Sequence, residues 1–108
     1  MPAYQIVVSP TALQDVQQIW DYIAVQNADA ATRVTDEIWL AFHHLGRFPN
    51  SGDVRTDLAG DRPLRFWRAG SYFIVYRVTE STIEIAAILH GSRDIPAVLR
   101  DRDDDVRD

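Results

Sequence analysis

Two consecutive apolar stretches decide the fold of this chain: Tyr-Phe-Ile-Val-Tyr-Arg-Val at residues 72–78 and Ile-Glu-Ile-Ala-Ala-Ile-Leu-His at residues 83–90. Both are rich in β-branched and aromatic residues, which favour strands. Residues 79–82 form a short connection, so we expect the two strands to pair as an antiparallel hairpin. The stretch 72–78 is apolar on both faces, which is typical of a central strand.

A third strand is predicted just before this pair, at residues 64–68, joined to it through a short turn at residues 69–71. The stretch 83–90 has one wholly apolar face and one mixed face. Because neighbouring strand residues point to opposite sides, we expect the apolar face to pack on helices and the mixed face to meet solvent or a partner. The apolar face holds Ile83, Ile85, Ala87 and Leu89, and the mixed face holds Glu84, Ala86, Ile88 and His90.

Two amphipathic helices are predicted upstream of the strands. Residues 4–8 form a β-prone opening strand, and Ser9-Pro10 is a typical helix start, with a capping hydroxyl before a proline at the first helical position. Apolar residues at helical spacing predict helices over 10–25 and 29–47. The break between them is short, which favours an antiparallel helical hairpin.

The remaining segments complete one α+β domain over residues 1–100: a helical hairpin on a small, mainly antiparallel sheet in the order β-α-α-β-β-β. Residues 48–61 are rich in Pro, Gly, Asp, Asn and Ser and are expected to form a loop. Asp94 is predicted to cap a short helix over 95–100. Residues 101–108 are acidic, and we expect a disordered tail there.

Composition narrows the class of protein. The chain has 108 residues and no cysteine, which fits one domain and excludes disulfides and thiolate metal sites. It has 16 acidic and 11 basic residues, a net charge of −5, and its basic residues are all arginine. A protein that grips nucleic acid through phosphates should be basic, so direct nucleic-acid binding is not expected. With no apolar run of about 18 residues and no basic leader, a cytoplasmic protein without membrane contact is expected.

Four pieces of sequence carry a resemblance to a known family. They are Ser9-Pro10 followed by Asp15, Ile19 and Tyr22, then Phe48-Pro49 followed by Gly52, then the strand 72–78, and finally Ile-Leu-His-Gly-Ser-Arg-Asp-Ile at residues 88–95. In this order and spacing they resemble toxins of the RelE/ParE superfamily of bacterial type II toxin–antitoxin systems, on the ParE side. The resemblance covers roughly residues 4–99.

The resemblance implies a toxin that a ParD-like antitoxin neutralises within a hetero-oligomer and that inhibits DNA gyrase. Under that interpretation no enzymatic activity, cofactor or metal is expected. The alternative is a RelE-type, ribosome-dependent and metal-independent mRNA endonuclease. A third hypothesis is a degenerate member that binds an antitoxin and harms nothing. The absence of lysine and the acidic net charge favour the ParE side.

The stretch 90–94 is the leading site candidate. Arg93 offers a planar donor fork and His90 a proton-transfer group. The structural alternative is a hydrogen-bonded histidine at a strand end and an internally paired arginine. A ribonuclease site would use His90 as base or acid, Arg93 or Arg65 as the cation and Tyr76 as a contact. Tyr76 is explained more simply as a core residue.

Other side chains are candidates for partner binding. Trp39, Trp67 and Ile88 are predicted to be exposed apolar anchors for the antitoxin. Arg65, Arg68 and Arg77 lie on adjacent strands, either as a shared cationic surface or as separate solubilising charges. Residues from 95 onward are a further candidate for target contact. His43 and His44 point about 100° apart on a helix and are not expected to bind a metal.

Overall fold

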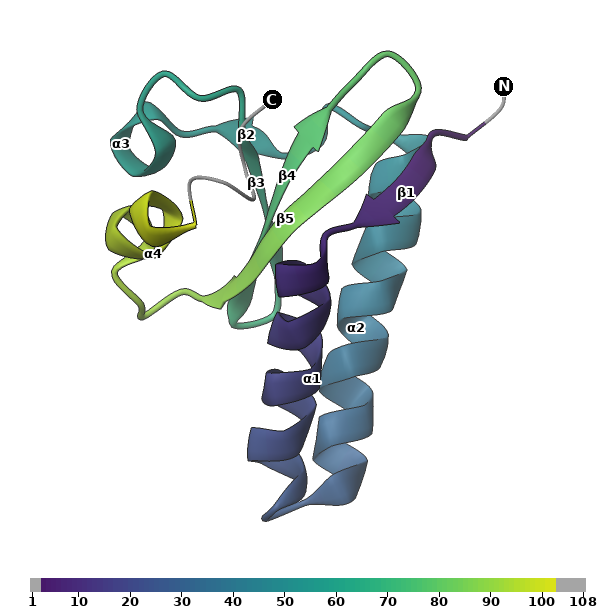
Figure 1. Cartoon of the computed structure of the whole chain (residues 1–108). Coiled ribbons are helices and arrows are strands. Elements are labelled where there is room, and N and C mark those ends of the chain that lie inside the picture. Colours follow the sequence, from purple (N-terminus) through teal and green to yellow (C-terminus); the bar gives the residue numbers. More distant parts are fainter. Residues whose placement is uncertain (1–2, 103–108) are drawn as a thin grey trace.

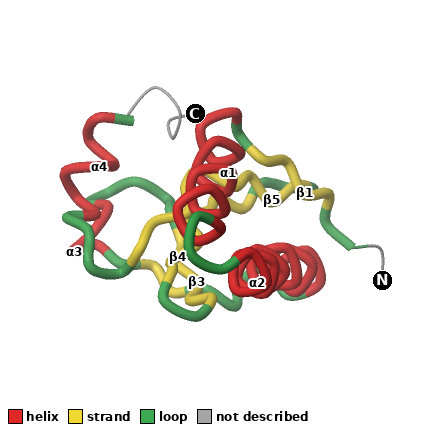
Figure 2. The backbone as a smooth tube through the Cα atoms, turned by 90° about the horizontal axis from the view of Figure 1, so that it is seen from below, coloured by secondary structure: helices red, strands yellow, loops and turns green. Residues whose placement is uncertain are grey.

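A five-stranded sheet lies between a long helical hairpin on one face and two short helices on the other (Figures 1 and 2). The computed structural model describes residues 3–102. The strand order is β1-β5-β4-β3-β2, in which β1 runs parallel to β5 and the other neighbours are antiparallel. The predicted α+β class, with a helical hairpin on a mainly antiparallel sheet, is confirmed.

Four of the five strands, all except β2, lie close to their predicted positions because their sequence signals are local. Short turns join the last three into antiparallel neighbours, as predicted. The strand β4 is central and buries side chains on both faces of the sheet. The bounds are β1 Gln5–Val8, β2 Asp53–Val54, β3 Arg65–Ala69, β4 Tyr72–Val78 and β5 Thr82–His90.

Both long helices begin at side-chain caps. The helix α1 spans Pro10–Ala24, and the Ser9 hydroxyl accepts from the Ala12 amide at 3.0 Å. The helix α2 spans Ala28–Arg47, and the Asn27 side chain accepts from the Ala30 amide at 2.9 Å. Each cap satisfies an amide that has no partner inside the helix. The hairpin runs out beyond the end of the sheet (Figure 1).

The segment 48–61 holds more regular structure than the predicted loop. The two-residue strand β2 pairs with the start of β3 and forms one edge of the sheet. The short helix α3, Thr56–Ala59, follows and packs near α4. The loop prediction was therefore wrong for these residues, because a strand and a helix this short carry too few residues for a readable period.

The face assignment of β5 was wrong for half of the strand. In the register, Val75 pairs with Ala87 and Tyr76 pairs with Ile85, so Ala86 is an extra residue that forms a bulge. Beyond the bulge the alternation is inverted. Ile83 and Ile85 face the hairpin as predicted, but Ile88 takes their side, while Ala87 and Leu89 turn to the opposite face.

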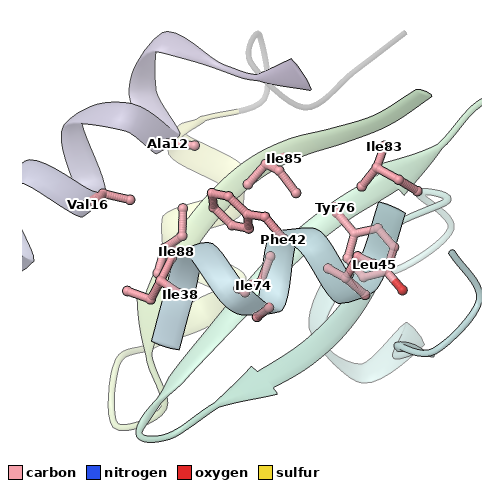
Figure 3. Packing of buried hydrophobic residues seen from close by; sticks show 11 residues of the cluster. Ala12, Val16, Ile38, Phe42, Leu45, Ile74, Tyr76, Ile83, Ile85 and Ile88 are labelled. Carbon is pink, nitrogen blue, oxygen red and sulfur yellow. The ribbon is translucent and has the colours of Figure 1, made fainter. Parts of the chain in front are cut away.

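Each face of the sheet has its own buried cluster. The hairpin side holds buried aliphatic and aromatic side chains from α1, α2, β4 and β5, which Figure 3 shows from close by. The other side is covered by α3 and α4 and is built around Leu64, Phe66, Val75, Leu89 and Leu99. The sequence predicted that the mixed face of the sheet would meet solvent or a partner. In the structure α3 and α4 cover this side of the sheet instead.

The C-terminal helix α4, Ile95–Asp101, begins where it was predicted. The Asp94 carboxylate accepts from the Ala97 amide at 3.2 Å. Asp101 is the last residue of α4, and Arg102 follows as its C-terminal cap, so these two residues of the predicted tail belong to the folded part. Residues 103–108 lie outside the described residues. Among residues 3–102, no helix is long and apolar enough to cross a membrane.

Candidate functional site

The predicted site at the end of β5 lines an open hollow of about 500 Å³. The hollow lies between α1 and the β5–α4 connection, and its walls combine tyrosine rings with polar groups. We call it the His90 hollow. It is lined by Asp15, Gln18, Ile19, Tyr22, Tyr72, Ile88, His90, Ser92 and Arg93.

His90 is the last residue of β5, and its ring is held in one orientation. The Nδ1 atom accepts from the Ser92 amide at 3.1 Å and lies 2.7 Å from the Ser92 hydroxyl oxygen. The ring meets Tyr72 edge to face at 5.2 Å. A backbone amide can only donate, so Nδ1 is an acceptor and the neutral ring carries its proton on Nε2. His90 is thus a hydrogen-bonded residue at a strand end that still presents a donor.

Arg93 is exposed, and its backbone amide closes a turn by donating to the His90 carbonyl at 3.0 Å. The internal ion pair considered for Arg93 is not present within residues 3–102. Arg93 therefore lines the hollow without a carboxylate partner among residues 3–102.

Asp15 is a buried polar residue in the lining of the hollow and was missed as a site residue. Its carboxylate is only 5% exposed, although it lies on α1 among apolar neighbours. The two terminal guanidinium nitrogens of Arg102 donate to it at 2.7 and 2.8 Å, and the Ile88 amide donates to Oδ2 at 2.9 Å. An acidic residue at helical spacing between Ala12 and Ile19 was the available signal.

The four residues of the predicted ribonuclease site do not come together. Tyr72 pairs with His90 in the sheet, whereas Tyr76 pairs with Arg65 on the neighbouring strand β3. Tyr72 and Tyr76 are four residues apart on one strand, a separation of roughly 13 Å. His90 and Arg93 therefore lie at one end of the sheet, and Tyr76 and Arg65 lie towards the other.

Tyr76 and Arg65 anchor the loop that follows α2. The Tyr76 hydroxyl donates to the Pro49 carbonyl and accepts from the Gly52 amide, each at 2.8 Å. Arg65 donates to the Gly52 carbonyl at 2.7 Å. Burial raises the pKa of Tyr76 above its ordinary value, although the Gly52 amide and Arg65 act in the opposite direction. The core interpretation of Tyr76 is supported by its complete burial.

The three strand arginines do not share a surface. Arg65 lies on the hairpin side of the sheet, with Tyr76 opposite it. Arg68 lies on the other side, 5.2 Å from the Phe73 ring centre, and donates to the Gly70 carbonyl. Arg77 forms an ion pair with Glu84 across β4 and β5. Each guanidinium has its own local partner, so the idea of one cationic patch was wrong.

The three predicted apolar anchors have different environments. Trp39 is 45% exposed, as predicted. Trp67 is half-buried and stacks on His44, with ring centres 4.9 Å apart. Ile88 is only 2% exposed and lies in the core beneath α1 (Figure 3), so it was wrongly predicted to be exposed. The bulge at Ala86 caused this error by turning Ile88 inward.

Trp39 lies between two open hollows on the helical hairpin, which together we call the hairpin groove. One hollow, of about 760 Å³, lies between β1 and α2 and is lined by Ile6, Val8, Asp36, Trp39, Leu40, Phe42 and His43. The other, of about 650 Å³, lies between α1 and α2 and includes Leu13, Val16, Trp20 and Trp39. Leu40 is 67% exposed, and Leu13 is also largely open, although neither was predicted as an anchor.

The paired histidines show no metal-binding arrangement. His44 lies 3.0 Å from the Ser51 hydroxyl and stacks on Trp67, while His43 lines the hairpin groove. Within residues 3–102 there is no group of three or more histidine, cysteine, aspartate or glutamate side chains that could hold a metal ion.

Comparisons with known proteins give a consistent result. Residues 6–95 match the family described as the ParE toxin of type II toxin–antitoxin system, parDE. The chain is 31% identical over 94 residues to the protein named "Putative toxin Y4kP" of Sinorhizobium fredii (strain NBRC 101917 / NGR234), covering 82% of this chain and 88% of that protein. A solved structure of the chromosomal ParDE TA system from P. aeruginosa superimposes with a TM-score of 0.69 at 19% identity, over 82% of this chain and 96% of that one. At that identity, the structural likeness concerns the fold.

Proposed function

Because this chain belongs to the ParE toxin family of type II toxin–antitoxin systems, we propose that it inhibits DNA gyrase and that a ParD-like antitoxin neutralises it by covering the hairpin groove. A ParE-type toxin within a parDE pair implies an antitoxin partner. The gyrase target and the mode of neutralisation are our proposal. Gyrase acts in the cytoplasm, so the proposal places the toxin there.

The observation that carries the neutralisation proposal is the exposed apolar surface around Trp39. Large apolar side chains lie open on both sides of this ring, in two adjoining hollows. Contiguous apolar surface of this kind marks interaction sites, and tryptophan is a common centre of binding energy. A groove along a helical hairpin suits the apolar face of an amphipathic helix from the antitoxin.

Two observations favour gyrase over messenger RNA as the target. The four residues predicted for an RNA-cleaving site do not come together, because Tyr76 and Arg65 are engaged at the loop near the far end of the sheet while His90 and Arg93 line the His90 hollow. The chain is also acidic overall, which disfavours binding to a polyanion. Direct contact with the gyrase protein requires neither an assembled RNA-cleaving site nor a basic protein.

The proposal is tested first with the purified chain in two parallel assays. Gyrase supercoiling of relaxed plasmid should be inhibited, with accumulation of cleaved DNA, while ribosome-bound messenger should stay intact. In cells without antitoxin, the DNA-damage response should precede any fall in translation. Messenger cleavage with normal gyrase activity would replace this proposal with the RelE-type alternative. No effect in either assay, for a folded protein that binds its antitoxin, would indicate the degenerate member.

A further inference from the structure

We propose that the His90 hollow binds an acidic peptide segment of a protein partner, with one carboxylate on Arg93 and His90 and a neighbouring apolar side chain against the tyrosine rings. This surface is distinct in its lining residues from the hairpin groove. The inference stands on the hollow itself and does not depend on gyrase being the target.

The polar half of the hollow offers two donors for one anion. The Arg93 guanidinium has no carboxylate partner within residues 3–102, and a planar fork of this kind matches a carboxylate. His90 adds a neutral donor, because the Ser92 amide occupies Nδ1 and leaves the proton on Nε2. The turn closed by the Arg93 amide on the His90 carbonyl holds these two residues together.

The nearby acidic groups do not cancel this positive charge. Asp15 is neutralised by the two-bond pair with Arg102 and also accepts from the Ile88 amide. Asp94 follows Arg93 in sequence, but its carboxylate accepts from the Ala97 amide at the start of α4 and is not among the lining residues. Among residues 3–102, no carboxylate therefore pairs with the Arg93 guanidinium of this hollow.

The other half of the hollow suits an apolar or aromatic side chain. Tyr22 is 81% exposed on α1, and Tyr72 stands near it on β4. Burial, and next the proximity of Tyr22, raise the pKa of Tyr72, so the Tyr72 phenol is neutral at physiological pH. Ile19 adds a half-buried aliphatic surface. Rigid amphipathic rings next to a cation are a common composition for protein recognition.

The charge of the site favours a peptide over a nucleic acid. One arginine and one neutral histidine match a single carboxylate, whereas a nucleic-acid strand presents a phosphate at every nucleotide and requires a basic track. The chain carries a net charge of −5, which opposes a polyanion.

The test is a titration of the full-length chain followed by amide NMR shifts. The probes are the blocked tripeptide acetyl-Glu-Phe-Glu-amide, its neutral counterpart acetyl-Gln-Phe-Gln-amide, and a single-stranded RNA hexamer. The acidic peptide should shift the amides of Gln18, His90, Ser92 and Arg93 in a saturable way. Its affinity should fall about five-fold or more in Arg93→Gln, because a charge-assisted hydrogen bond is lost.

Arg100→Gln is the matched control, because Arg100 is an exposed arginine on α4 that does not line the hollow. It should leave the affinity unchanged, and Tyr22→Ala should weaken binding without unfolding the protein. Equal binding of the neutral peptide, or equal effects of the two arginine variants, would overturn the proposal. Tighter binding of RNA at the same amides would overturn it in favour of a nucleic acid. If Asp103→Asn, Asp104→Asn and Asp105→Asn together moved these amides before any peptide was added, the occupant would be the chain itself.

Discussion

Asp15 and Arg102 show how strongly one residue pair connects the two ends of this chain. They are 87 positions apart in the sequence, and the carboxylate of Asp15 lies on the buried side of α1. The two parallel hydrogen bonds and the Ile88 amide satisfy a charge that would otherwise be costly inside the protein. The pair therefore holds the end of α4 against α1 and β5.

Arg102→Met should lower the free energy of unfolding by about 3 kcal/mol, because it leaves the buried Asp15 carboxylate without its cation. Methionine keeps a long apolar stem, so packing changes little. Arg100→Met makes the same substitution at an exposed position in the last turn of α4, two residues before Arg102, and should change stability by less than about 0.5 kcal/mol. Urea unfolding of the two variants measures the difference. If both variants lost a similar free energy of unfolding, the Asp15–Arg102 ion pair would make no specific contribution to stability.

Tyr76 should make stability depend on pH on the alkaline side. Burial raises the pKa of its phenol above the ordinary value of 10.0, so the folded protein holds this proton more tightly than the unfolded chain does. The corresponding stabilisation is complete below pH 10 and is lost as the pH rises through the folded-state pKa. Tyr72, whose pKa is also raised, contributes in the same sense.

Tyr76→Phe separates this proton effect from the hydrogen bonds. At pH 7 it should cost about 1–3 kcal/mol, because the buried Gly52 amide loses its acceptor. Above pH 10 its unfolding free energy should fall less steeply than that of the wild type, since phenylalanine does not ionise. Unfolding curves between pH 8 and 11.5 give both quantities. If the unfolding free energies of the wild type and of Tyr76→Phe fell equally with pH, Tyr76 would hold its proton no more tightly in the folded state than in the unfolded chain.

At the level of elements, the sequence predicts what depends on neighbouring residues and misses what depends on register. The bounds of α1, α2 and β4 follow from caps and periodicity, and the prediction was within one residue of each. The bulge at Ala86 has no local signature, yet it inverts the last part of β5. For that reason Ile88 was placed on the wrong face.

The candidate site was predictable to the same extent. The sequence located His90 and Arg93 at a strand-to-helix junction, and the structure places both in one hollow. It did not separate them from Tyr76 and Arg65, because that distance follows from strand pairing. Leu40 was missed because it lies beside the helical stripe that faces the core, so the stripe gives no signal for it.

The loop after α2 gives an element-level prediction at Gly52. A methyl group there would lie 2.7 Å from the Tyr76 hydroxyl oxygen and 2.9 Å from the Phe66 carbonyl oxygen, both far inside contact distance. Gly52→Ala should therefore displace the loop and lower the unfolding free energy by about 1–3 kcal/mol. Gly60→Ala, which meets no atom within 4 Å but has a positive φ of 62°, should cost only about 1 kcal/mol.

Hydrogen exchange shows whether the damage at Gly52 is local. In Gly52→Ala the backbone amide of residue 52 and the amides that pair β2 with β3 should lose their protection from exchange first. The reason is that Tyr76 and Arg65 both hold this loop. Protection of the α1–α2 hairpin should stay near that of the wild type. A uniform loss across the chain would mean that the loop is not a separate unit of stability.

At the scale of the whole molecule, the hairpin groove and the His90 hollow give a toxin two separate surfaces. Trp39 lines the first and is absent from the second, and Arg93 has the opposite distribution. An antitoxin that covered only the hairpin groove would block toxicity either by overlapping the target surface or by holding the toxin away from it. Variants at the two surfaces distinguish binding of the antitoxin from action on the target.

Trp39→Ala should leave the toxin active but resistant to its antitoxin. The ring is 45% exposed and makes one edge-to-face contact with Phe42, so truncation should cost only about 1 kcal/mol of stability. At the centre of an interface the same truncation costs about 2 kcal/mol or more, which corresponds to roughly 30-fold weaker antitoxin binding.

Phe48→Ala removes another exposed ring that lies outside both surfaces, and this variant should be neutralised normally. Growth of cells that express each variant with and without antitoxin, together with titration of the purified pair, decides the matter. If Trp39→Ala were neutralised as well as Phe48→Ala, the antitoxin would have to bind elsewhere, and the His90 hollow would become the first surface to test.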